Sequence, residues 1–387
     1  MSRLRHLAIA GGIAGGVAAG AALAVGVPRY LARRSRADEG DPYAAEPFEL
    51  PPTNSVRTVT TGDGVAVHVE TVGPENAELT VVFSHGYLHD ASVFYFQRKA
   101  IAEAAGLGRS LRAVFYDQPG HGRSGPLPRP EYTIDDLALA LGDVIEAVAP
   151  TGPLVLVGHS MGGMAVQAFP RVRPDLFAER VAGAGFLSTS PAGLDTVETK
   201  PMRALRRLRR TVLPLLQQIT GAGWTPQLID RARLLSGDIG YLITRRNAFA
   251  HERPPHSLVT LVERMNRHTP VQSVVGYVRA ILDHDETATL PQFSGLPVLV
   301  AVGDSDILTP PQHSQRLAEA IAGSRLALIA DAAHTPQLEY PGEISQLLLE
   351  MIDKSAVGID STGETNTAGP QRRLRWSPFS RHTHAEE

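Results

Sequence analysis

The chain has no cysteine among its 387 residues, and this absence excludes several kinds of chemistry. Without thiols there are no disulfide bonds, no cysteine-bound zinc, no iron–sulfur clusters and no cysteine nucleophile. A strong charge imbalance is also lacking, because 37 basic and 40 acidic residues give a formal net charge of −3. This balance does not favour nucleic-acid binding, and we expect no nucleic-acid partner. With 43% hydrophobic residues the chain can fill a sizeable core, which excludes wholesale disorder.

Residues 1–36 contain a long uncharged run, from Leu7 to Val27, with basic residues on both sides. At about 1.5 Å per helical residue, the run is long enough to cross a bilayer. We favour an uncleaved single-pass anchor. The alternatives are a cleaved signal peptide with Ala22-Leu23-Ala24 as its small-residue site, and a mobile tail. The sequence therefore predicts a membrane-associated protein with the membrane as a partner, or a secreted protein if the segment is cleaved.

The remaining chain divides by composition into four further parts. Residues 37–54 are rich in proline and predict an extended linker, and 355–387 lack a hydrophobic period and predict a disordered tail. Residues 55–190 and 291–354 have the pattern of an α/β core. Residues 191–290 interrupt this pattern with helical stretches, and we expect them to form a helical cap over the strand ends.

The two core stretches alternate short apolar runs with amphipathic helical patterns. The expected strands are 65–69, 79–83, 113–116, 154–157, 181–187, 298–302 and 326–329, and the expected helices are 92–105, 133–149, 161–172, 310–322 and 341–352. This alternation predicts a doubly wound α/β fold with a mainly parallel sheet that is covered on both faces. Ligands of such sheets bind at the carboxyl ends of the strands.

A glycine-rich turn joins one predicted strand to the next helix and contains a serine. The sequence is Gly158-His159-Ser160-Met161-Gly162, directly after the strand 154–157. Glycines permit a tight strand-to-helix turn, which lifts the Ser160 hydroxyl clear of the sheet. The pattern therefore predicts a nucleophile elbow with Ser160 as the nucleophile.

A serine hydroxyl needs a base, and the base needs an orienting acid. Two downstream strands end in suitable residues: 298–302 is followed by Asp304 and Asp306, and 326–329 is followed by His334. We assign His334 as the base and Asp306 as the acid, with Asp304 as the alternative acid. Because all these residues follow carboxyl ends of strands, we expect them to meet Ser160 at one edge of the sheet.

Two backbone N–H groups are expected to stabilise an oxyanion. Met161 follows Ser160 at a helix N-terminus, and Tyr87 follows the turn His85-Gly86 after strand 79–83. The glycine-rich loop 117–124 is expected to be scaffold without a role in bond making. No cluster of His, Asp and Glu has the spacing of metal ligands, so we expect no metal and no other cofactor.

These motifs, in this order, resemble the α/β-hydrolase fold family, in particular its capped serine hydrolases of the actinobacterial type. The resemblance runs across roughly residues 55–352 and rests on the glycine turns, on the acid loop 303–310 and on His334. Ala333 stands where the family often has glycine. The resemblance implies a serine esterase acting on small-molecule esters, and the expected anchor and helical cap add lipid-like esters as candidate substrates. A cofactor-free perhydrolase or haloperoxidase with the same triad, and a non-catalytic membrane-tethered binding protein, are the alternatives. Epoxide hydrolases and haloalkane dehalogenases have an aspartate at the elbow, which argues against both.

Overall fold

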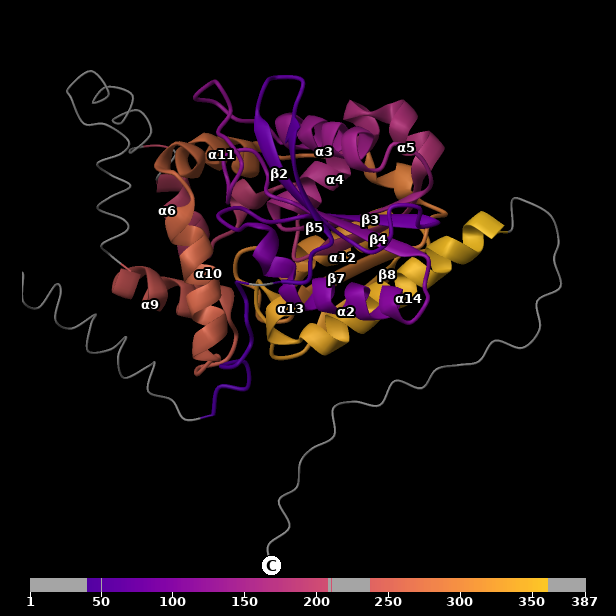
Figure 1. The fold of residues 1–387 in the computed structure, drawn as a ribbon. Helices are drawn as coiled ribbons and strands as arrows, with labels where there is room; N and C mark the ends of the chain where they lie inside the picture. The colour runs from indigo at the N-terminus through magenta and orange to yellow at the C-terminus, as the bar shows by residue number, and fades with distance from the viewer. Residues whose placement is uncertain (1–39, 50, 208–209, 211–236, 361–387) are drawn as a thin grey trace, which may run out of the picture.

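The computed structural model describes residues 40–49, 51–207, 210 and 237–360, and an eight-stranded sheet forms its centre (Figure 1). The strands lie in the order β1-β2-β4-β3-β5-β6-β7-β8. They are β1 (Ser55–Thr60), β2 (Ala66–Val72), β3 (Leu79–Ser84), β4 (Leu111–Tyr116), β5 (Leu154–His159), β6 (Val181–Leu187), β7 (Val298–Gly303) and β8 (Arg325–Ile329). The pairings β1–β2 and β2–β4 are antiparallel, and all the others are parallel. The predicted mainly parallel sheet is confirmed.

Hydrophobic content explains which strands could be predicted. Every residue of β3, β4, β5 and β7 is buried, as expected of strands with helices on both faces. β1 was not predicted, because its sequence SVRTVT is polar and only Val59 is buried. It lies at the edge of the sheet, where the backbone pairing with β2 fixes it.

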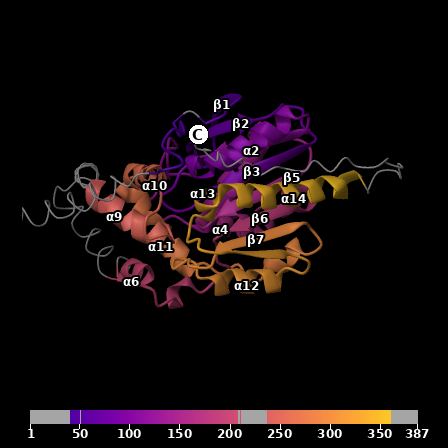
Figure 2. The same cartoon turned by 90° about the horizontal axis from the view of Figure 1, so that it is seen from below.

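Helices cover both faces of the sheet (Figures 1 and 2). On one face lie α3 (Ile134–Val148), α4 (Met161–Val172) and α12 (Pro311–Ala320), and α2 (Tyr95–Gly106) and α14 (Pro341–Asp360) lie on the other. The short helix α5 (Pro174–Arg180) follows α4, and the single turn η1 (Ala91–Phe94) precedes α2. Each face has its own apolar core, so the sheet is held between two packed layers.

The last helix is longer than expected, since α14 continues to Asp360 and not to Ile352. The added turns pack on the sheet: Ser355 is buried, and its hydroxyl donates to Met351 O at 3.0 Å. Gly183 in β6 makes this close approach possible, because a Cβ there would meet the Ser355 hydroxyl at 2.2 Å. The helix therefore extends into residues assigned to the tail.

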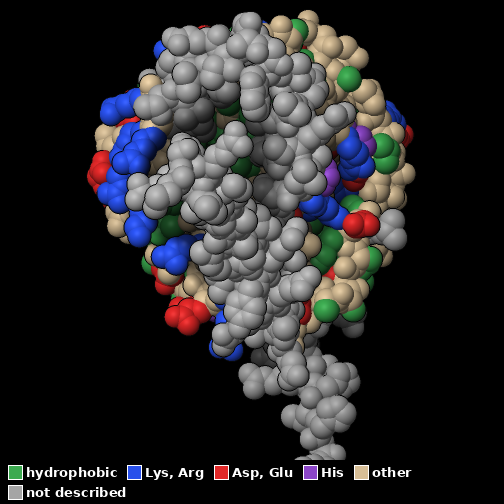
Figure 3. All heavy atoms as spheres, turned by 90° about the vertical axis from the view of Figure 1, so that its left-hand side faces the viewer, with side chains coloured by type: hydrophobic (Ala, Val, Ile, Leu, Met, Phe, Trp, Pro, Cys, Tyr) green, Lys and Arg blue, Asp and Glu red, His purple; other side chains and the backbone are tan. Residues whose placement is uncertain are grey.

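The segment between β6 and β7 is helical in the part that the structure describes. It contains η2 (Leu194–Thr196), α6 (Lys200–Arg207), α9 (Gly237–Ala248), α10 (His256–His268), α11 (Val271–Asp283) and η4 (Leu290–Phe293). Figure 1 shows α6, α9, α10 and α11 gathered at one end of the sheet. Figure 3 shows the molecule from this end, with Lys and Arg side chains near the edges of the face. We call residues 191–290 the helical segment.

The expected linker is corrected for residues 40–49, which pack on the folded core. The Tyr43 ring lies 5.0 Å from that of Phe96, and the Phe48 ring lies 4.7 Å from that of Tyr95. Asp41 accepts hydrogen bonds from the backbone N–H of Ser257 at 2.7 Å and from its hydroxyl at 3.0 Å. The prolines of this segment suggest an extended chain, but its two aromatic rings supply enough apolar surface to dock it against α2. We call residues 40–49 the N-terminal strap.

The structure also corrects the predicted membrane location. Within residues 40–49, 51–207, 210 and 237–360, no helix is both long and apolar enough to cross a bilayer. The uncharged run 7–27 lies outside the described residues. That run is mostly glycine and alanine, so length and lack of charge, not strong hydrophobicity, suggested an anchor. The prediction of a membrane-associated protein is wrong on this finding, and the membrane is not retained as a partner.

Candidate active site

Ser160 lies between β5 and α4 in a backbone conformation that side chains rarely adopt. Its φ is 51° and its ψ is −120°. Two hydrogen bonds hold this conformation: Ser160 N donates to Leu187 O at 2.9 Å, and the Thr189 hydroxyl donates to Ser160 O at 2.7 Å. A strained serine at a strand-to-helix turn has the geometry of a nucleophile elbow.

The two elbow glycines are required by close packing. A Cβ at Gly158 would lie 2.5 Å from Gly162 O, and a Cβ at Gly162 would lie 2.1 Å from Ser84 O. Neither residue has a positive φ. Glycine is therefore needed at both positions because neighbouring backbone approaches closely, and not because φ is positive.

His334 and Asp306 lie in line with the Ser160 hydroxyl. The His334 Nε2 atom is 3.0 Å from Ser160 Oγ, and its Nδ1 atom is 2.9 Å from Asp306 Oδ2. All three side chains are buried or nearly so. With the ring hydrogen on Nδ1, His334 donates to the carboxylate and leaves Nε2 free to accept the serine hydrogen bond.

Backbone and side-chain donors keep Asp306 charged. Its Oδ1 accepts from Leu308 N at 2.8 Å and from Thr309 N at 3.0 Å, and its Oδ2 accepts from the Thr309 hydroxyl at 2.8 Å. Burial raises the pKa of Asp306, but the charge of His334 and these hydrogen bonds outweigh burial and lower the pKa below its usual range. Asp304, the alternative acid, is exposed and accepts from the Ser305 hydroxyl at 2.9 Å.

The two expected oxyanion donors belong to segments that adjoin Ser160. Met161 is the first residue of α4, and the first N–H groups of a helix have no partner within that helix. In the second segment, a Cβ at Gly86 would lie 3.0 Å from the Ser160 Cβ, so the loop that continues into Tyr87 passes close to the serine. Leu88, the next residue, has a φ of 65°, which is strained for a bulky side chain.

The helical segment holds this strained loop. The Tyr87 hydroxyl donates to Val274 O in α11, and the Thr269 hydroxyl donates to Leu88 O at 3.2 Å. The Tyr277 hydroxyl donates to Pro119 O at 2.9 Å on the neighbouring loop. Thus α11 and Thr269, which lies just before it, hold the loops that follow β3 and β4.

Four histidines near the site are buried and neutral at pH 7. Burial lowers the pKa of His85 to about 4 and the pKa of His121 and His159 to about 3, and it lowers the pKa of His89 well below its ordinary value. The His159 Nε2–H donates to His334 O at 2.8 Å. His159 therefore helps to hold the loop that contains His334.

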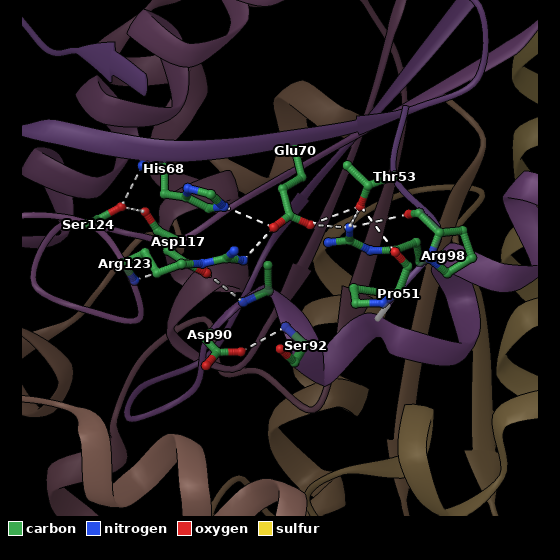
Figure 4. A network of polar contacts seen from close by, with 12 residues as sticks. Pro51, Thr53, His68, Glu70, Asp90, Ser92, Arg98, Asp117, Arg123 and Ser124 are labelled. Carbon is green, nitrogen blue, oxygen red and sulfur yellow. Dashed lines mark hydrogen bonds and ion pairs between the residues drawn. The ribbon is translucent and has the colours of Figure 1, made fainter. Parts of the chain in front are cut away.

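The loop 117–124 connects the site to a buried carboxylate (Figure 4). Asp117 accepts from Ala91 N at 2.9 Å and from Arg123 N at 2.9 Å, which ties the loop after β4 to the turn η1. The guanidinium groups of Arg98 and Arg123 both contact the carboxylate of Glu70 in β2. Burial raises the pKa of Glu70, but the His68 hydrogen bond and the two arginines lower it far below its usual range. Through Arg123, these contacts hold the loop against β2.

Sequence reasoning missed three supporting residues: Thr189, Thr309 and Glu339. Thr309 is the one with a sequence signal, because a threonine three residues after an aspartate is placed to close a turn onto its carboxylate. Thr189 and Glu339 contact backbone atoms that only the folded chain brings near them. Among the described residues, no group of three or more His, Asp or Glu side chains could hold a metal ion.

A strained serine turn on a mostly parallel sheet, with a histidine at its hydroxyl, defines the class of α/β hydrolases. The model of the Alpha/beta hydrolase family matches residues 81–347, more than half of the chain, and the chain belongs to this family. It is therefore a hydrolase by family. The predicted fold class and the predicted resemblance are both confirmed.

Similar curated proteins have different activities in their names. The putative carbamate hydrolase RutD of Stutzerimonas stutzeri is 22% identical over 271 residues, which cover 70% of this chain and 90% of that protein. The polyketide synthase ThaQ of Burkholderia thailandensis is 24% identical over 262 residues, 66% of this chain. The chain spans only 11% of the length of that synthase.

Solved structures show the same fold. An esterase from Thermogutta terrifontis superposes with a TM-score of 0.59 at 23% identity, covering 78% of this chain and 100% of the esterase. A bromoperoxidase from Bacillus anthracis superposes with a TM-score of 0.60 at 19% identity, covering 77% of this chain and 100% of the other.

Proposed function

We propose that the protein is a serine hydrolase that cleaves small carboxylic esters through an acyl-enzyme. The observation that supports this proposal is the unbroken line of polar contacts from the Ser160 hydroxyl through His334 to Asp306. Family membership alone supports a hydrolase, and the serine at the elbow favours ester chemistry over reactions that start from an aspartate nucleophile.

In the proposed mechanism, Ser160 Oγ attacks the carbonyl carbon of the ester. His334 Nε2 takes the hydroxyl proton and later gives it to the leaving alcohol, whose C–O bond breaks. Asp306 holds the ring tautomer and stabilises the imidazolium, while its low pKa keeps it charged throughout. The backbone N–H groups of Met161 and Tyr87 stabilise the oxyanion; the loss of one such donor typically costs about 2.7–4 kcal/mol. Water, activated by His334, then cleaves the acyl-enzyme.

The first prediction is that Ser160→Ala abolishes turnover. The variant removes the attacking oxygen, so hydrolysis of p-nitrophenyl acetate should fall to the uncatalysed rate and covalent labelling by a fluorophosphonate probe should disappear. Ser305→Ala is a matched control, because Ser305 is an exposed serine on the acid loop. It should retain both activities. Labelling of Ser160→Ala at the rate of the unmodified protein would refute the assignment of the nucleophile.

Perhydrolysis is a second candidate, supported by the likeness in fold to a bromoperoxidase. An acetyl-enzyme would form from acetic acid with release of water, and hydrogen peroxide would then attack its carbonyl carbon, which releases peracetic acid and returns the proton to the Ser160 oxygen. Comparing peracid formation from acetate and peroxide with ester turnover, in the same preparation, separates the two functions. Lipid-like substrates are not carried forward, because that expectation depended on a membrane anchor.

A further inference from the structure

A buried glutamate joins the loop of His334 to the helical segment. Glu339 is the last residue of α13 (Pro336–Glu339), the short helix that follows His334. Its Oε1 accepts from Ala333 N at 2.7 Å, and Ala333 directly precedes His334. Its Oε2 accepts from Ala250 N at 2.8 Å, and Ala250 lies between α9 and α10. One carboxylate thus fixes two backbone positions that lie 83 residues apart.

Two neighbouring contacts strengthen the same junction. The buried hydroxyl of Thr335 donates to Ala248 O at 2.9 Å, and the Tyr340 hydroxyl lies 3.2 Å from His251 Nε2. Residues 248–251 of the helical segment are therefore tied to residues 333–340 at several points. We call this set of contacts the junction. Its central member is Glu339, because one carboxylate bonds both to Ala333, which precedes His334, and to Ala250 in the helical segment.

The charge of Glu339 determines how strongly its carboxylate binds the backbone N–H groups of Ala333 and Ala250. As a carboxylate it accepts both N–H groups, and bonds to a charged acceptor are stronger than neutral ones. Burial raises the pKa of Glu339 to about 7 in spite of the two N–H donors; Asp306 raises it further and His334 lowers it. Tyr340, beside it, also faces Asp331, Asp304 and Glu343. Below pH 7 a proton on one oxygen weakens one of the two backbone bonds.

We propose that Glu339 is a positioning residue for His334, which it acts on through Ala333, and that it couples the place of this base to the helical segment. The inference rests on the proposed function of the site. A base must lie within hydrogen-bond reach of the proton it takes, and a misplacement of about 1 Å can cost roughly 100-fold in rate. His334 O is already held by His159 from the elbow side. Glu339 supplies the second support, from the side of the helical segment.

The test is Glu339→Gln, with Glu343→Gln as its matched control. The glutamine keeps the shape but presents an NH2 group to one of the two backbone N–H groups. Glu343 is an exposed glutamate at the start of α14, so its variant has the same change of charge without the junction. We expect Glu339→Gln to lower kcat on p-nitrophenyl acetate about tenfold or more, with KM within about twofold. Glu343→Gln should leave both unchanged.

A pH profile separates positioning from a loss of folded protein. In the unmodified protein a proton on Glu339 weakens the junction on the acid side, so kcat should fall more steeply below pH 7 than it does in Glu339→Gln. Glu339→Gln has no carboxylate at this position, so this additional fall in kcat should be absent. A kcat within twofold of the control, with the same fall below pH 7 in both proteins, would overturn the inference.

Two further variants separate a failure of the inference from misfolding and from a failure of the proposed function. If Glu339→Gln does not fold, as judged by circular dichroism, Thr335→Val cuts the neighbouring bond to Ala248 and should lower kcat in the same direction. An unchanged kcat in Thr335→Val would then count against the junction. Ser160→Ala is measured alongside: if it stays active, the proposed function fails, whereas an inactive Ser160→Ala beside a fully active Glu339→Gln refutes only the role of Glu339.

Discussion

At the scale of single residues, the site depends on small polar groups that place the reacting atoms. Thr309 is an example, since its hydroxyl donates to Asp306 Oδ2 at 2.8 Å and lies 3.4 Å from His334 Nδ1. A buried carboxylate with fewer donors holds its charge less well. The threonine therefore acts on His334 through the acid.

Thr309→Val should weaken the acid without removing it. The substitution keeps the shape of the side chain and deletes one donor to a charged oxygen, which typically costs about 1.5–3 kcal/mol. We expect a lower free energy of unfolding in urea by about this amount and a several-fold lower kcat. Thr151→Val, at an exposed position, serves as the control. Equal kcat in the two variants would show that Asp306 does not depend on Thr309.

Single residues also show what a sequence can predict and what it cannot. Ser160, Asp306 and His334 could be expected at one edge of the sheet because each follows the carboxyl end of an apolar strand. This order of strand and polar residue can be read directly from the sequence. Glu339 could not, because its partners are backbone N–H groups of Ala250 and Ala333, and any glutamate in a helix looks the same in the sequence. Asp306 could be preferred to Asp304 only by its spacing, whereas in the structure one is buried against His334 and the other exposed.

At the scale of elements, the N-terminal strap connects α10 to the core. Asp41 accepts two hydrogen bonds from Ser257, the second residue of α10, and so places a negative charge at the N-terminus of this helix. On the core side, Glu46 pairs with Lys99 at 2.8 Å in α2. The prolines of this region suggested an extended chain, so sequence reasoning did not predict its packing.

Asp41→Ala should loosen α10 without affecting the sheet. Loss of a side chain that caps a helix costs about 0.5–2 kcal/mol. We expect faster hydrogen exchange of the backbone amides in the first turns of α10, and unchanged exchange in β5. Glu319→Ala, at an exposed position of α12, is the control. If α10 exchanges at the same rate in both variants, the strap does not stabilise it.

At the scale of the whole molecule, buried neutral histidines make the fold sensitive to acid. Burial lowers the pKa of His85 and His284 to about 4 and that of His121 and His159 to about 3, whereas the ordinary value is 6.5. Between these values the unfolded chain binds protons that the folded chain does not bind. The unfolded state is therefore favoured as the pH falls below 6.5, and the effect is complete only near pH 3–4.

The free energy of unfolding should accordingly fall between pH 6.5 and pH 4.5. Each of the four histidines contributes at most about 1.4 kcal/mol per pH unit over this range. Glu339 has the opposite effect, because its raised pKa favours the folded state as the pH falls, but it is a single group. Urea unfolding at pH 7, 6, 5 and 4.5 measures the slope. A free energy that is constant over this range would contradict the burial of these rings.

The anchoring of the helical segment has a consequence for protein engineering. Its contacts reach both the loop of Tyr87, through Val274, and the loop of His334, through Ala250. A chimera that exchanges residues 191–290 for the corresponding part of a relative, in order to change substrate choice, would therefore disturb the oxyanion side and the base side together. Such a graft needs to bring compatible partners for Tyr87 and Glu339 with it, and libraries that vary the helical segment should keep these two anchor points fixed.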